Sequence, residues 1–120
     1  MTADMLDLAK RAVACKGWRW MPGMLAVEQA VPGMALSTRP VRVDEYWHEV
    51  GVWLPDLTDP ATLGCLLALV REAWDQKSIT SQVVSNKKWL VIYKGFGTPN
   101  RFFYGTTEVE VLVTALEVAP

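Results

Sequence analysis

Apolar residues recur at helical spacing near the start of the chain, and this pattern predicts a helix from Asp4 to Cys15. Thr2 is placed to cap this helix, and Gly17 is placed to end it. The expected buried face consists of Met5, Leu8, Ala9, Ala12 and Cys15.

A second helix is predicted in the stretch PDLTDPATLGCLLALVREAWDQK. Thr58 or Asp59 caps it, and Pro60 occupies its first turn. Gly64 lies inside this helix, where glycine costs about 1 kcal/mol relative to alanine, so close packing against another backbone is expected there. The apolar face comprises Leu63, Leu66, Leu67, Val70 and Trp74.

A third helix is predicted in the stretch TTEVEVLVTALEVA near the end of the chain. Thr106 or Thr107 caps it, and Thr107 with Glu110 matches the capping-box pattern. The expected buried stripe comprises Val109, Leu112, Val113 and Leu116.

Between the first two helices the pattern changes to that of short strands. The segments MLAVEQ, GMALS, VRVDE and YWHEVGVWL are rich in β-branched and aromatic residues, and they predict two to four strands. Turns or breaks between them are expected at Pro22-Gly23, Pro32-Gly33 and Pro40.

Three more strands are predicted between the second and third helices. SITSQVV and KWLVIYK form a hairpin that turns at Ser85-Asn86, and RFFYG follows after a loop. Both faces of KWLVIYK are apolar, so we expect a central strand covered on both sides.

This order of elements predicts an α+β fold, with three helices layered on a mainly antiparallel sheet, in a single domain over residues 1–120. The chain is 51% apolar, but its longest apolar run, Cys65 to Val70, is far shorter than the roughly 20 residues that span a bilayer. Asp4 and Asp7 interrupt the N-terminal segment, so no signal peptide is expected. We therefore predict a soluble protein.

Charge and cysteine content exclude several classes of function. Twelve Lys and Arg against thirteen Asp and Glu give a net charge of -1, and the cations are scattered, which disfavours binding to long nucleic acid. Cys15 and Cys65 are expected to be free, buried thiols. His48 is the single histidine and no Cys-x-x-Cys motif is present, so neither a metal nor a cofactor is expected. Familiar hydrolase and nucleotide-loop motifs are also missing, so no enzyme activity is expected.

Four features together resemble the small proteins of tailed bacteriophages grouped as the phage ABA-sandwich type. They are the Gly17-Trp18 pair after the first helix, the WLPDLTDPATLG segment, the KWLVIYK strand and the final GTTEVEVLVTALEVA helix. The resemblance implies a layered α-β-α sandwich and a phage accessory protein that acts in the cytoplasm of the host bacterium. Some unrelated small phage proteins sequester nucleotide messengers of host immunity, and the same role here is an analogy.

The segment CKGWRWMPGM contains the first candidate binding residues. If it is extended, Trp18 and Trp20 share one face and Arg19 points to the other. The two rings then form a platform for a nucleobase, or they fill the core where the first helix meets the sheet.

A second aromatic cluster contains Tyr46, Trp47, His48 and Trp53, with Glu45 and Glu49 among them. Trp47 is a candidate for ligand contact. A histidine among carboxylates is also a conceivable general base, but no nucleophile accompanies it, so this catalytic interpretation is disfavoured.

The segment YKGFGTPNRFFYG is a candidate ligand loop. Lys94 and Arg101 bracket it and would clamp a phosphate, while Phe96 would stack on a base. The competing interpretation is a connection between strands with solvated cations, because Gly95 and Gly97 do not make the dinucleotide fingerprint.

The leading hypothesis is a non-enzymatic protein that binds a small nucleotide-derived ligand and sequesters a host anti-phage signal. The alternative is a protein-interaction module that inhibits a host defence or regulatory protein, and a third possibility is a phosphodiesterase-like enzyme. A homo-oligomer is also expected to be feasible, because self-association hides short edge strands. The predicted ligand-binding residues are Trp18, Arg19, Trp20, Trp47, Lys94, Phe96 and Arg101.

Overall fold

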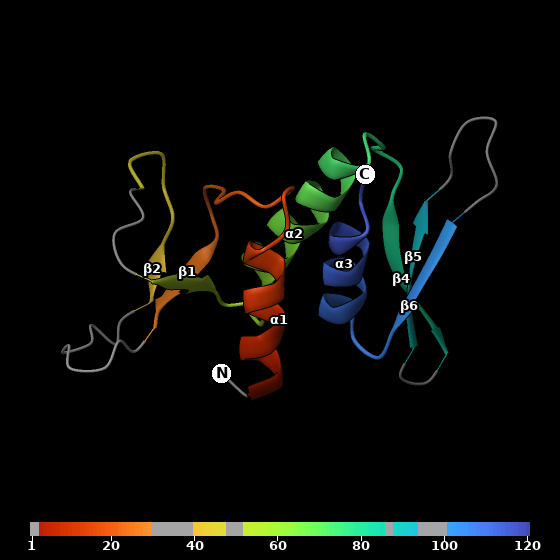
Figure 1. Ribbon diagram of the computed structural model, residues 1–120, viewed down its shortest axis with the longest axis horizontal. Helices are drawn as coiled ribbons and strands as arrows, with labels where there is room; N and C mark the ends of the chain where they lie inside the picture. The colour runs from red at the N-terminus through yellow and green to blue at the C-terminus, as the bar shows by residue number, and fades with distance from the viewer. Residues whose placement is uncertain (1–2, 30–39, 48–51, 86–87, 94–100) are drawn as a thin grey trace.

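The computed structural model describes residues 3–29, 40–47, 52–85, 88–93 and 101–120 (Figure 1). The helices are α1 (Ala3–Val13), α2 (Pro60–Ala73) and α3 (Glu108–Glu117). The strands are β1 (Leu25–Glu28), β2 (Val41–Arg42), β3 (Trp53–Pro55), β4 (Thr80–Ser85), β5 (Lys88–Tyr93) and β6 (Arg101–Gly105).

The described strands form two antiparallel sheets. The N-terminal sheet has the order β2-β1-β3, and the C-terminal sheet has the order β4-β5-β6. Figure 1 shows these sheets on opposite sides of a layer made by the three helices. The α+β class and the antiparallel pairing are as predicted, whereas one sheet in an α-β-α sandwich is not confirmed. Periodicity shows which segments are strands, but it carries no information on which strands share a sheet.

Helix α3 lies at the centre of the molecule, which explains why it is apolar on most of its surface. It packs against α1 and α2 on one side and against β5 and β6 on the other. A helix that is enclosed in this way needs apolar residues all round rather than along one stripe. Beyond the four predicted positions, Val111 and Ala115 are therefore also fully buried.

Helix α1 ends earlier than the sequence predicts, at Val13 rather than Cys15. Leu8, Ala9 and Ala12 are buried as predicted, and Cys15 lies in the turn that follows. A Cβ atom at Gly17 would come within 3.2 Å of the Ala73 Cβ atom. Gly17 therefore allows this turn to approach the end of α2.

Helix α2 begins at the cap that its sequence favours. The Asp59 carboxylate accepts a hydrogen bond from the Thr62 backbone nitrogen, and Pro60 follows in the first turn. The buried face differs slightly from the prediction, because Thr62 and Leu69 are fully buried while Leu63 and Leu67 are only partly so. The elements that α2 contacts in the folded protein, α3 and β1 among them, determine which of its residues are buried.

The expectation for Gly64 is wrong. A Cβ atom at this position would meet nothing within 4 Å, and the residue is exposed. No close backbone approach therefore explains this glycine.

The Pro22-Gly23 turn is confirmed. The Met24 backbone nitrogen donates to the Met21 carbonyl oxygen across it, and Gly23 has a φ of 99°. Proline followed by a glycine with positive φ is typical of a type II turn. This turn directs the chain into β1.

Strand predictions hold best in the C-terminal sheet. β4, β5 and β6 coincide with the three predicted segments, and β5 is central. On the neighbouring strand β6, Phe102 and Tyr104 are exposed. The predicted cover of both faces of β5 stays a prediction, because the side chains of β5 lie outside the described residues. The predicted strand GMALS and the Pro32-Gly33 turn lie outside the described residues.

The core is continuous across the helix layer. It includes Met24 and Leu54 from the side of the N-terminal sheet and Ile79 next to the C-terminal sheet. In the described part of the chain, no helix is long and apolar enough to cross a membrane.

Candidate functional site: a row of four tryptophans

Four tryptophans from three separate segments of the chain lie in a row, in which each ring contacts the next. The ring centroids of Trp18 and Trp20 are 5.5 Å apart, those of Trp20 and Trp47 are 5.6 Å apart, and those of Trp47 and Trp53 are 5.3 Å apart. Two of these contacts are edge-to-face and one is tilted, which are the favoured geometries for aromatic pairs. We call this set the tryptophan row.

Local backbone structure brings each member of the row into place. Trp18 and Trp20 lie in the connection between α1 and β1, where the backbone is neither helix nor strand. Trp47 follows a turn in which the Asp44 carboxylate accepts from the Tyr46 backbone nitrogen. Trp53 begins β3 and pairs with Glu28 of β1.

The four rings are half-buried against the core rather than fully enclosed. Trp18 and Trp20 therefore match parts of both interpretations, the binding platform and the core filling. Each residue packs on the core and is still partly exposed. The indole nitrogens of Trp18 and Trp47 are buried and have no hydrogen-bond partner in the described structure. Trp53 was expected in one aromatic cluster with Trp47, but it was not among the predicted binding residues.

Arg19 points away from the row, toward α2. Its guanidinium donates to the Glu72 carboxylate at 2.8 Å, and both side chains are more than half exposed. This hydrogen bond raises the pKa of Arg19 and lowers the pKa of Glu72. Arg19 is therefore engaged by an exposed ion pair, which contributes little to stability.

Of the remaining predicted site residues, the structure describes only Arg101. Lys94 and Phe96, like His48 of the second aromatic cluster, lie outside the described residues. Arg101 begins β6, in the sheet across the helix layer from β3 (Figure 1). The described residues thus bring together Trp18, Trp20 and Trp47, and they place Arg101 at the other side of the molecule.

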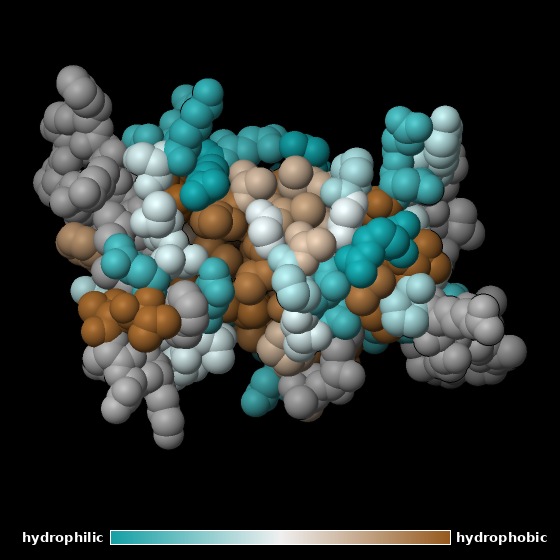
Figure 2. Space-filling view, turned by 180° about the vertical axis from the view of Figure 1, so that it is seen from behind, coloured by the Kyte–Doolittle hydropathy of each residue, from teal (hydrophilic) through white to brown (hydrophobic). Residues whose placement is uncertain are grey.

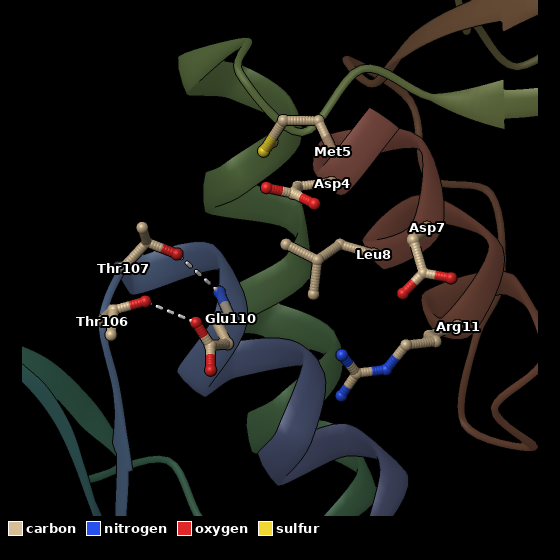
Figure 3. A pocket seen from close by; sticks show the side chains of 8 residues that line it. All are labelled: Asp4, Met5, Asp7, Leu8, Arg11, Thr106, Thr107 and Glu110. Carbon is tan, nitrogen blue, oxygen red and sulfur yellow. Dashed lines mark hydrogen bonds between the residues drawn. The ribbon is translucent and has the colours of Figure 1, made fainter. Parts of the chain in front are cut away.

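A cavity of about 400 Å³ lies between α1 and the start of α3 (Figure 3). In the figure, Asp4, Leu8, Arg11 and Glu110 point toward one another across it. Arg11 is held by a bidentate contact to Glu117, at 2.6 and 3.2 Å, which raises the pKa of Arg11. Met5, Asp7, Thr106 and Thr107 complete the lining.

This cavity is acidic, so it disfavours a phosphate-bearing ligand. The Glu110 carboxylate accepts from the Thr106 hydroxyl at 2.6 Å, and the Glu110 backbone nitrogen donates to the Thr107 cap (Figure 3). The sequence pattern identifies Thr107 and Glu110 as a cap, but nothing in their spacing places α1 opposite them. Only tertiary packing creates this cavity.

Metal-binding chemistry has no support in the described ranges, where no cluster of three or more His, Cys, Asp or Glu could hold an ion. Cys15 and Cys65 are free and half-buried, and burial raises the pKa of each thiol. Both thiols are thus poorly suited to nucleophilic chemistry at neutral pH.

Comparison of the chain with protein-family models, curated proteins and solved structures finds no match. The function is therefore inferred from the geometry of the site and from the sequence resemblance.

Proposed function

We propose that this protein is a non-enzymatic accessory protein of a tailed bacteriophage that binds a small nucleotide-derived ligand at the tryptophan row. In this proposal it acts in the host cytoplasm and sequesters a signal of anti-phage immunity. The observation that carries the proposal is the row itself, because three separate segments contribute partly buried indole rings that contact one another.

The energetics of stacking support a base-binding role. A nucleobase on an aromatic side chain contributes about 1 to 3 kcal/mol, and the contribution needs no charge. Trp20 is the best test position, because it contacts both Trp18 and Trp47. Removal of its ring would therefore interrupt the row in the middle.

The test is calorimetric titration of the wild-type protein with cyclic nucleotides and cyclic ADP-ribose isomers. We expect one ligand to bind and to be recovered intact after the complex is heated. Trp20→Ala should weaken binding about tenfold or more, as loss of one stacking contact predicts. Tyr104→Ala is the matched control, because Tyr104 is an aromatic residue with 63% exposure in the opposite sheet. If the wild-type protein binds none of these ligands, the proposal is refuted.

A second candidate function is favoured by the surface of the C-terminal sheet. Val83 and Val84 of β4 and Phe102 and Tyr104 of β6 are all about half exposed or more. Figure 2 shows hydrophobic side chains at the surface on the end of the molecule that this sheet forms. Several exposed apolar residues in one sheet are typical of protein-interaction surfaces.

The two candidate functions predict opposite effects of the same variants. If the protein blocks a host protein, a pull-down from bacterial lysate should recover a stoichiometric partner. Tyr104→Ala should then abolish recovery, whereas Trp20→Ala should leave it unchanged. A ligand-binding protein should show the reverse dependence in the titration.

A further inference from the structure

Two of the four indoles in the row carry buried hydrogen-bond donors without a partner. Among the described residues, neither Trp18 Nε1 nor Trp47 Nε1 meets an acceptor. Trp74 shows the usual situation, because its Nε1 donates to the Ala115 carbonyl oxygen at 2.9 Å. A buried N–H without an acceptor costs free energy, so an unpaired donor in a native protein calls for an explanation.

The charged residue nearest to the row in sequence, Arg19, bears on which part of a ligand the row binds. Arg19, which lies between Trp18 and Trp20 in sequence, is bound to Glu72 on α2. The cation that lies between the two rings in sequence is therefore paired with a carboxylate, and this pairing opposes its contact with a phosphate. Among the described residues, the row itself offers aromatic surface and two N–H donors.

We infer that the tryptophan row recognises an uncharged, planar heteroaromatic group, namely the base of the ligand, through acceptor atoms that pair with Trp18 Nε1 and Trp47 Nε1. This inference rests on the proposed function and specifies which part of the ligand the row binds. Ring nitrogens and exocyclic oxygens of a base supply in-plane acceptors, and the base plane supplies the stacking surface. The phosphate contributes little to binding at this site.

Burial of the two nitrogens has a consequence for the binding reaction. An acceptor reaches them only after a side chain moves, because both atoms are covered in the structure. We therefore expect association slower than diffusion-limited encounter and a change in tryptophan fluorescence on binding.

The first test compares a nucleoside with the corresponding nucleotide by calorimetry at two salt concentrations. The inference predicts equal affinity for both and little dependence on salt, because few ion contacts form. If the nucleotide binds but the nucleoside does not, this inference is wrong while the proposed function stands. If neither compound nor any cyclic ligand binds, both are refuted.

The second test removes one N–H donor and keeps an aromatic ring. Trp47→Phe should bind the nucleoside about tenfold more weakly, the effect of losing one buried hydrogen bond. Trp20→Phe is the matched control, since Trp20 is in the same row but its nitrogen is not one of the unpaired donors. Its affinity should stay closer to that of the wild type.

Before affinities are compared, thermal unfolding of each variant shows whether that variant is folded. If Trp47→Phe does not fold, Trp18→Phe takes its place. Nucleoside affinity equal to that of the wild type in the folded donor variants would overturn the inference. An equal loss in Trp20→Phe and Trp47→Phe would overturn it too, because ring size and not the donor would then matter.

Discussion

At the scale of single residues, two glycines show how much depends on surroundings that sequence does not reveal. A Cβ atom at Gly64 in α2 would have no neighbouring atom within 4 Å, whereas a Cβ atom at Gly105 would lie 3.0 Å from the Val111 backbone nitrogen. The first position has room for a side chain. The second is closed by the backbone of α3.

Alanine should therefore have opposite effects at these glycines. Gly64→Ala should stabilise the protein by about 1 kcal/mol, because alanine is the better helix former and meets no obstacle. Gly105→Ala should destabilise it by about 1 to 3 kcal/mol, because the clash is with backbone. Urea denaturation of both variants measures the difference, and destabilisation by Gly64→Ala would contradict the open space found there.

At the scale of elements, the start of α2 is fastened to the N-terminal sheet by polar contacts. Asp59 caps the helix and also accepts from the Arg42 guanidinium at 2.6 Å, while Arg42 donates to the Gly23 carbonyl oxygen. The buried Thr62 hydroxyl donates to Asp59 and accepts from the Leu25 backbone nitrogen at 2.8 Å. One carboxylate thus joins the cap to the edge of the sheet.

This arrangement predicts a specific pH dependence of stability. The hydrogen bond from Arg42 lowers the pKa of Asp59. The resulting stabilisation is complete above the pKa of unfolded aspartate, about 3.9, and is lost as the pH falls through the lower pKa of the folded state. Asp59→Asn keeps a capping side chain and removes the charge, so its free energy of unfolding should fall less steeply than that of the wild type in acid.

Asp59→Ala supplies the second arm of this experiment. It removes the cap as well as the charge and should cost about 1 kcal/mol or more at neutral pH. Denaturant titrations at several pH values separate the two contributions. The same acid dependence in Asp59→Asn and the wild type would show that other carboxylates dominate.

At the scale of the whole molecule, α2 and α3 connect the two sheets. The first turn of α2 binds β1 through Thr62, and the far end of α2 reaches the C-terminal sheet, where the ring centroids of Trp74 and Phe103 are 5.7 Å apart. Arg71 also donates to the Ile79 carbonyl oxygen next to β4. The helix layer is therefore shared, and we expect both sheets to unfold together.

Leu112→Ala tests this expectation, because Leu112 is fully buried in α3. It should cost about 2 to 5 kcal/mol, the usual range for a leucine removed from a core. Tryptophan fluorescence and far-UV circular dichroism should report one coincident transition at lower denaturant concentration. Separate transitions by the two methods would show that unfolding is not a single cooperative step, which would contradict this expectation.

The sequence by itself determined the elements of this protein. Helical spacing, the caps at Asp59 and Thr107 and the Pro22-Gly23 turn are local features, and local physics decides them without reference to distant residues. For the same reason the C-terminal strands could be predicted closely. Trp18, Trp20 and Trp47 were also identified as candidates, because large aromatic residues in short connecting segments stand out in the sequence itself.

Only the tertiary structure decided how these elements are combined. Separation into two sheets, enclosure of α3 between them and the contact of Trp53 with Trp47 depend on packing between segments far apart in the chain. The Arg19 pair with Glu72 and the acidic cavity between α1 and α3 depend on the same packing. Hydrophobic burial favours any arrangement that covers the apolar faces, and shape complementarity among all the side chains selects this one.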